Sequence, residues 1–171
     1  RNQLYSTFID KPIDEMIHDS KAMEIGESLF ANHCSTCHGS DAQGAVGFPN
    51  LTDDDWLYGG SPEQIVQTLT SGRTGMMPPW GAALGDEGVA QVAAYIRNFT
   101  NNGARSDGID VGEKNFAMFW GACRGADAKG NQMLGAPNLT NDIWLHSSDS
   151  GIIETALMGC IGGIMPAFSE I

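Results

Sequence analysis

The sequence contains an internal repeat, and this feature restricts the fold more than any other. Short motifs between residues 25 and 57 return in the same order between residues 111 and 145, about 86 to 88 positions later. The matching pairs are Ile25–Glu27 with Val111–Glu113, Gly39–Gly44 with Gly125–Gly130, Pro49–Thr52 with Pro137–Thr140, and Trp56–Leu57 with Trp144–Leu145. A fixed period with preserved order is typical of homologous domains within one chain. We therefore expect two copies of one small domain.

The repeat also predicts the domain boundaries. A lead-in without a counterpart covers residues 1–22, the first domain 23–101 and the second domain 111–171. Residues 102–110 form the linker, because Asn, Gly, Ser and Asp gather there as they do in turns. The second domain stops before any match to the helix expected near the end of the first, so it is predicted to lack its closing helix.

Three helices are predicted in the first copy. One covers residues 24–33. A second starts at Ser61 and ends at Gly72, because Ser61, Pro62 and Gln64 form a helix start with a cap and a proline in the first turn. Its buried face should contain Ile65, Val66 and Leu69.

The third helix is the clearest, at residues 86–99. Val89, Val92, Ala93 and Ile96 recur there at helical spacing. No strand pattern competes with these helices, and 22 glycines and 7 prolines indicate extensive loops. The predicted fold class is all-α, with two tandem small domains whose long loops surround a large cofactor.

The cofactor is predicted from Cys34, Cys37 and His38, which form the Cys-x-x-Cys-His attachment signature of haem c. On a helical turn, two thiols three residues apart can each bond one vinyl group of the same porphyrin. The next residue then lies below the iron, so His38 is the predicted proximal ligand.

Two other interpretations of this motif are weaker. A thioredoxin-like redox pair would require a strand followed by a helix and would not need a histidine. A zinc site requires two more ligands at suitable spacing. His33 and His38 are near, but the remaining cysteines, Cys123 and Cys160, belong to the other copy.

The sixth iron ligand is predicted to be Met77, which lies about 40 residues after the attachment motif and directly before a proline. A thioether is a soft ligand that favours ferrous iron and suits an electron carrier. Methionine often only fills a core, but here a haem motif accompanies it. Met76 is the second choice.

The second copy departs from this pattern. The positions that match Cys34, Cys37 and His38 contain Trp120, Cys123 and Arg124. Arginine cannot ligate iron, because its guanidinium stays protonated and has no free lone pair. Met165 and Pro137 nevertheless match Met77 and Pro49, so the distal half of a haem site is kept.

Three interpretations of the second copy are open. It could be a haemless relic with Cys123 and Cys160 bridged, it could hold haem through one thioether on Cys123 with Met165 on the distal side and another ligand in place of the missing histidine, or the sequence there could contain an error. We favour a second haem, because its loss would leave a large cavity in a small domain. His146 could serve as another ligand, although its match to Tyr58 favours a surface loop.

The net charge of −12 and the pI near 4.4 argue against a nucleic-acid partner, which would require clustered Lys and Arg. An acidic surface instead favours encounters with basic proteins. No stretch has the roughly 20 apolar residues needed to cross a bilayer.

The run Leu29–Gly44, together with Gly47–Thr52 and Asp55–Leu57, resembles class I cytochrome c domains and, more closely, the dihaem subunit of cbb-type haem-copper oxidases. The resemblance covers nearly the whole chain. It implies electron transfer from a soluble cytochrome donor towards the oxidase core subunit, a periplasmic location and a membrane anchor outside this segment. It implies no bond-making catalysis in this chain.

The same resemblance implies further contacts of the first haem. Pro49 would accept a hydrogen bond from the ring of His38, Arg73 would meet a propionate, and Trp56 and Trp80 would pack near the ring. The alternatives are a free soluble dihaem carrier, a haem-based sensor with an exchangeable sixth ligand, and, with least support, a peroxidase.

Overall fold

A computed structural model describes residues 6–9, 11–100 and 108–169 of the chain. By backbone proximity the chain divides into two compact units. Unit 1 consists of residues 1–53 and 61–63, and unit 2 of residues 54–60 and 64–171. Unit 2 therefore groups residues 64–100, which the repeat assigns to the first copy, with the second copy. Most of the predicted linker, residues 101–107, lies outside the described residues.

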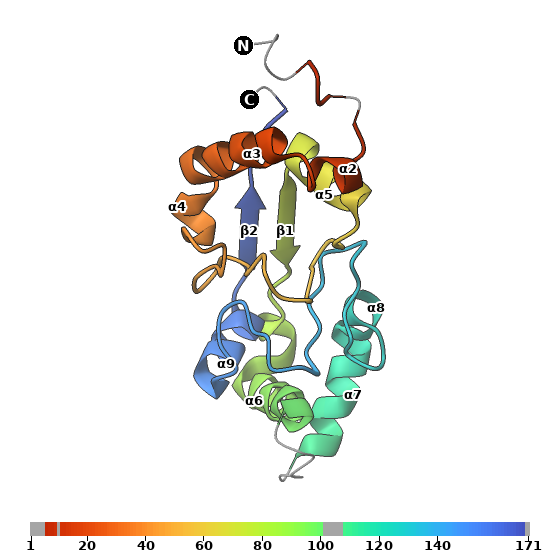
Figure 1. The fold of residues 1–171 in the computed structure, drawn as a ribbon. Helices are drawn as coiled ribbons and strands as arrows, with labels where there is room; N and C mark the ends of the chain where they lie inside the picture. The colour runs from red at the N-terminus through yellow and green to blue at the C-terminus, as the bar shows by residue number, and fades with distance from the viewer. Residues whose placement is uncertain (1–5, 10, 101–107, 170–171) are drawn as a thin grey trace. The chain divides into compact units, whose positions relative to one another are not determined.

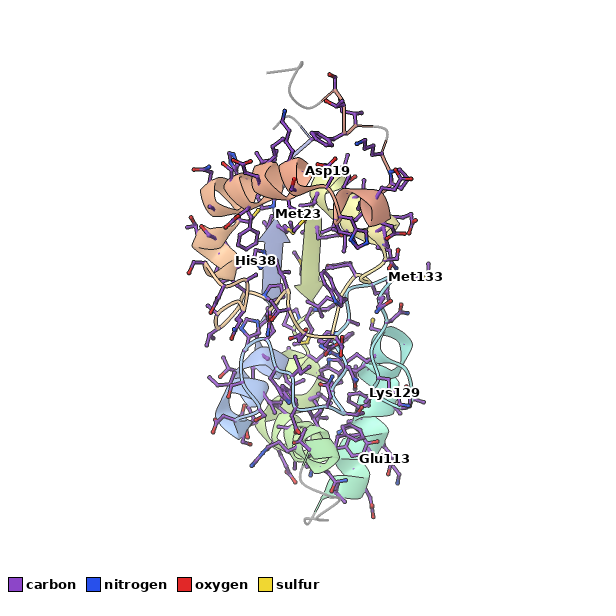
Figure 2. The ribbon with its side chains drawn as sticks, viewed as in Figure 1. Asp19, Met23, His38, Glu113, Lys129 and Met133 are labelled. Carbon is purple, nitrogen blue, oxygen red and sulfur yellow. The ribbon has the colours of Figure 1, made fainter. Side chains whose placement is uncertain are left out.

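Unit 1 contains three helices: α2 (Ile13–Met16), α3 (Ser20–His33) and the single turn α4 (Ser35–His38). Helix α3 begins four residues before the predicted start at residue 24, because Asp19 caps it. The Asp19 carboxylate accepts hydrogen bonds from the backbone N–H groups of Lys21 and Ala22 at 3.0 and 3.2 Å. Figure 2 labels Asp19 at this end of α3.

Helix α5 (Pro62–Ser71) ends at Gly72, as predicted, and Gly72 takes the positive φ of +69° that a terminating glycine allows. The predicted buried face of α5 is wrong. Val66 and Leu69 are 48% and 39% exposed, and no residue of α5 is buried. Hydrophobic spacing predicts a face, but only a packing partner buries it.

The expectation that no strand would form is also wrong. Strands β1 (Arg73–Met77) and β2 (Ile161–Met165) form a two-stranded antiparallel sheet in unit 2, which Figure 1 shows as two neighbouring arrows. The register pairs Arg73 with Met165 and Met77 with Ile161. Glycines occupy three of the ten strand positions, and glycine is depleted in strands, so the local sequence gave little indication of this long-range pairing.

The core of unit 2 is centred on α6 (Gly81–Thr100), which packs against α7 (Ile109–Phe119) and α9 (Ser150–Met158). Helix α6 is kinked at Gly85, where φ is +66°, and its regular part begins at Asp86 as predicted. The four predicted core positions of α6 are all confirmed as buried: Val89, Val92, Ala93 and Ile96. Phe116, Trp120, Ile153 and Leu157 join them in one hydrophobic cluster.

Both copies share the same loop backbone after the attachment turn. The N–H of Gly44 donates to the His38 carbonyl at 2.8 Å, and the N–H of Gly130 donates to the Arg124 carbonyl at 2.9 Å. Ala42 and Ala128 have positive φ angles of 60° and 56°. This agreement, found separately in each unit, supports the repeat inferred from sequence. No helix in the described part of the chain is both long and apolar enough to cross a membrane.

Candidate functional site

The attachment motif forms one compact turn in unit 1. The N–H of Cys34 donates to the Phe30 carbonyl at the end of α3, and the N–H of His38 donates to the Cys34 carbonyl, both at 2.9 Å. The turn therefore holds the two cysteines and His38 close together on a short backbone. Both thiols are free; Cys34 is half-buried and Cys37 is exposed. Cys34, Cys37 and His38 are thus brought together in the arrangement that haem attachment requires.

The loop that follows His38 holds its imidazole in one orientation. Figure 2 labels His38 beside α4. The imidazole is 8% exposed, and Nδ1 lies 3.0 Å from the Pro49 carbonyl oxygen. With Nδ1 as the donor, Nε2 keeps its lone pair, and no described residue hydrogen-bonds to it. A carbonyl partner on the far nitrogen is the usual device that fixes the tautomer and direction of a metal-binding histidine.

Gly44 makes this contact possible. Its φ is +74°, and a Cβ there would collide with the backbone of Phe48, Pro49 and Asn50. A larger residue would therefore push the Pro49 carbonyl away from the His38 ring.

The structure weighs against the two other interpretations of the motif. Burial, and then the neighbouring Cys37, raise the pKa of the Cys34 thiol above its ordinary value. A thioredoxin-like pair functions through a lowered pKa. Among residues 6–9, 11–100 and 108–169, no three His, Cys, Asp or Glu side chains gather as a metal site, which gives the zinc interpretation no support.

Unit 1 is suited to a large apolar cofactor because it has almost no interior of its own. Among its described residues His38 alone is buried, and α3 buries no side chain. Ile17, Met23 and Phe48 are 51%, 53% and 43% exposed. A buried imidazole with little apolar core around it fits a unit that completes its interior with porphyrin, so the residues present fit haem c.

The predicted sixth ligand, Met77, belongs to unit 2, whereas His38 belongs to unit 1. Their sharing of one iron therefore stays a prediction. Met77 is half-buried, and its sulfur accepts a hydrogen bond from Nη2 of Arg124 at 3.4 Å. The second choice, Met76, is 74% exposed.

Arg73 has local partners that the sequence did not indicate. Its guanidinium lies over the ring of Tyr58, 4.7 Å from the ring centre, and its Nε donates to the Thr68 hydroxyl at 2.9 Å. These contacts fix the side chain by a cation–π interaction and a hydrogen bond. A role at a propionate stays a prediction.

The two predicted tryptophans pack at different places in unit 2. The ring of Trp56 lies against Gly60, where an added Cβ would be 3.0 Å from the ring. Trp80 contacts Phe119, with ring centres 4.9 Å apart, and lies edge-on to Trp120 at 6.2 Å. Trp80 thus packs against residues of the second copy.

In the second copy, Arg124 at the end of α8 (Gly121–Arg124) takes over the hydrogen bond that His38 makes in the first. Its Nη1 donates to the Pro137 carbonyl at 3.2 Å, just as Nδ1 of His38 meets Pro49. Burial lowers the pKa of the Arg124 guanidinium, but its ordinary pKa is so high that the group remains charged at neutral pH. The repeat alignment identified this position, but it did not indicate the contact with Met77.

The ligand role of Met165 stays a prediction. The strand register places Met165 at the opposite end of the two-stranded sheet from Met77, four residues or about 14 Å away. Cys123 and Cys160 are both free and exposed, so the structure does not have the disulfide considered from the sequence. His33 and His146 are exposed.

Comparison with known proteins gives one consistent family. A family model described as cytochrome C oxidase, cbb3-type, subunit III matches residues 21–96. A cbb3-type cytochrome c oxidase subunit CcoP of Rubrivivax gelatinosus is 47% identical over 144 residues, which cover 84% of this chain and 47% of that protein. A FixP subunit of Sinorhizobium medicae is 40% identical, covering 86% of this chain and 54% of that protein. The chain spans about half the length of these curated relatives.

Proposed function

Because the chain is a c-type cytochrome related to the CcoP and FixP subunits of cbb3-type oxidases, we propose that it transfers electrons through haem c towards such an oxidase. The observation that carries this proposal is the buried His38 imidazole, whose Nδ1 is bound to the Pro49 carbonyl while two free thiols precede it on the same turn. We further propose that residues 23–101 and 111–171 are two copies of one cytochrome c-type domain, of which the first holds haem.

The residues of the first copy have separate tasks. Cys34 and Cys37 would hold the cofactor covalently, and His38 would offer its Nε2 lone pair to the metal. The Pro49 carbonyl accepts a hydrogen bond from Nδ1–H of His38, and this contact fixes the direction of Nε2. When bound, haem c supplies a one-electron iron couple, and the protein sets its potential through ligands and burial.

We assign the sixth position to Met77. Its thioether is a soft donor suited to ferrous iron, and the following proline restrains its backbone. Ligation would require Met77 to leave Arg124, and a hydrogen bond to a thioether is a weak one. Arg73, Trp56 and Trp80 complete the proposal as a propionate partner and ring contacts.

A second haem, predicted on Cys123 with Pro137 below it and Met165 as ligand, has less support. Arg124 provides no lone pair at the proximal position, and Met165 lies away from that guanidinium. These residues do not fit a ligated haem, so the proposed electron transfer does not involve the second copy.

The partners follow from the relatives, which are named as oxidase subunits. We propose a soluble cytochrome as donor and the oxidase core subunit as acceptor, with the chain located in the periplasm and membrane-associated through a segment outside this sequence. Oxygen reduction would take place in the core subunit, so this chain is an electron carrier and not itself the catalyst.

The proposed ligands can be tested on the chain expressed with the haem c maturation system. Native protein should give a low-spin spectrum that carbon monoxide does not change. Met77→Ala should open the sixth position, allow carbon monoxide to bind and lower the reduction potential. Met76→Ala and Met165→Ala are the matched controls and should leave the spectrum unchanged. If Met165→Ala opened the position and Met77→Ala did not, the ligand assignment would be wrong.

The oxidase role needs a separate measurement. Native protein should be recovered in the membrane fraction together with oxidase activity. Recovery as a free protein in the periplasmic fraction would favour the soluble carrier, and a carbon monoxide-sensitive reduced spectrum of the unaltered protein would favour the sensor.

A further inference from the structure

The second copy keeps the backbone of the attachment turn but changes the side chains that would hold a cofactor. The N–H of Trp120 donates to the Phe116 carbonyl at 2.8 Å, as that of Cys34 does to Phe30 at 2.9 Å. The backbone of the turn is therefore the same in both copies, and the copies differ in the side chains at the positions of Cys34 and His38.

The guanidinium of Arg124 lies between two hydrogen-bond acceptors, at the position where the first copy has the imidazole of His38. One end donates to the Pro137 carbonyl at 3.2 Å and the other to the Met77 sulfur at 3.4 Å. These two acceptors come from the loop below the site and from β1. A metal could not be ligated by this side chain, because the guanidinium is a cation with no lone pair, whereas the first copy has an imidazole at the matching position.

Trp120, at the position of the first thioether cysteine, belongs to the core. It is 3% exposed, stacks on Phe116 with ring centres 6.3 Å apart and planes at 15°, and meets Trp80 and Phe119 edge-on. This position therefore contributes packing where the first copy contributes a bond to the cofactor.

Unit 2 has a cluster of buried hydrophobic residues, whereas no hydrophobic residue of unit 1 is buried among those that the structure describes. Ten residues are buried in that cluster, and α6 supplies four of them. Its members come from α6, α7 and α9, from Trp120 directly after α7, and from the loop that carries Ala128 and Leu139. Unit 1 has only His38 buried among its described residues.

We propose that the second copy binds no haem and is a structural domain, closed by Trp120, Arg124 and α6, so that the chain carries a single haem on the first copy. In the structure Arg124 joins the Pro137 loop to β1 through the Met77 sulfur. When Met77 ligates the haem of the first copy, Arg124 would keep its hydrogen bond to Pro137. The number of haems per chain rests on the proposed function of the first copy, whereas the absence of haem at residues 120–124 does not.

Peptide mapping of the full chain, matured with its haem, separates the two claims. The expected result is one haem per polypeptide by pyridine haemochrome and by intact mass, with the haem on the peptide that contains Cys34 and Cys37. Haem on the peptide that contains Cys123, even through one thioether, would overturn this inference. No haem on the Cys34 peptide would overturn the proposed function and leave the inference about residues 120–124 standing.

A double variant tests whether the side chains of Trp120 and Arg124 exclude haem from the second copy. Trp120→Cys with Arg124→His restores a complete attachment motif on an unchanged turn, and the haem content should rise from one to two per chain. Arg124→His alone is the matched control and should remain at one. If the double variant also stayed at one haem, these two side chains would not be what excludes the cofactor, and the inference would fail.

Discussion

At the scale of single residues, one backbone position shows how two copies of a domain can diverge. His38 and Arg124 both donate to the carbonyl of a proline in the next loop, at 3.0 and 3.2 Å. The imidazole has a second nitrogen with a lone pair, whereas every nitrogen of a charged guanidinium is a donor. The same scaffold contact can therefore orient a side chain that is able to ligate a metal in one copy and one that is not in the other.

At Trp120, the cost of an unpaired indole N–H competes with the gain from burying the aromatic ring. Its indole N–H has no hydrogen-bond partner among the described residues, which costs roughly 1–3 kcal/mol. Burying an aromatic side chain of roughly 150–250 Å² contributes about 4–6 kcal/mol at about 25 cal/mol per Å². The apolar contribution is larger, so the unpaired N–H is tolerated.

The substitution His38→Arg tests this comparison in the first copy. The guanidinium can still reach the Pro49 carbonyl but cannot ligate iron, so the low-spin haem spectrum should be lost almost completely. Absorption and magnetic circular dichroism measure this, with Thr36→Ala on the same turn as the control. An unchanged low-spin spectrum would show that His38 is not the proximal ligand.

At the scale of the elements, two matching glycines report where α6 packs. A Cβ at Gly112 on α7 would collide with the Gln91 carbonyl on α6 and come within 3.0 Å of Tyr95 Cβ, whereas a Cβ at Gly26 on α3 would meet nothing within 4 Å. The repeat aligns these two glycines, but the structure gives only Gly112 a close helix crossing.

Gly112→Ala should therefore destabilise the protein by about 1–3 kcal/mol through overpacking. Gly26→Ala should be neutral or stabilise it by up to about 1 kcal/mol, because alanine favours helix more than glycine. Urea unfolding followed by tryptophan fluorescence compares the two variants directly. The reverse order would mean that α6 packs against α3 instead.

The N-terminus of α3 makes stability depend on pH. Hydrogen bonding, first from the Ala22 N–H, lowers the pKa of the Asp19 carboxyl. The folded pKa lies below the unfolded one, so the stabilisation is fully present above the ordinary aspartate pKa of about 3.9 and is lost as pH falls through the folded value.

Asp19→Ala should consequently be less stable than the native chain at pH 6, and this difference should shrink as the pH falls below about 4. Asp19→Asn keeps a capping oxygen without the charge, so it should lie between the two at pH 6. Thermal melts by circular dichroism provide the comparison. A native advantage that stayed constant down to pH 2 would exclude the carboxylate as its source.

At the scale of the whole molecule, the net charge of −12 bears on the proposed electron transfer. It favours approach of a partner with a basic surface before any contact is made. The effect acts over the Debye length, which shortens from about 30 Å at 0.01 M salt to about 8 Å at 0.15 M.

The rate of electron transfer with a basic soluble cytochrome should therefore fall about tenfold or more over that range of salt. Stopped-flow absorbance with an acidic cytochrome as the control partner measures the contrast, and the control rate should stay level or rise. Equal salt dependence for both partners would rule out steering by net charge.

The sequence alone determined the features that depend on spacing along the chain. The Cys34–His38 motif, the α5 boundaries and the apolar period from Val89 to Ile96 are local patterns, because a helix repeats every 3.6 residues and haem attachment requires adjacent residues. The repeat likewise aligned Arg124 with His38, and the chemistry of the guanidinium alone excluded Arg124 as an iron ligand.

Tertiary structure decided the rest. Which helix α6 covers, the pairing of β1 with β2 and the contact of Arg124 with Met77 all join residues more than ten positions apart. Homologous segments carry the same local signals, so nothing in the sequence states whether α6 packs against Gly26 or Gly112. Only the competition between the two packings, settled by contact area and steric fit in the folded chain, makes that choice.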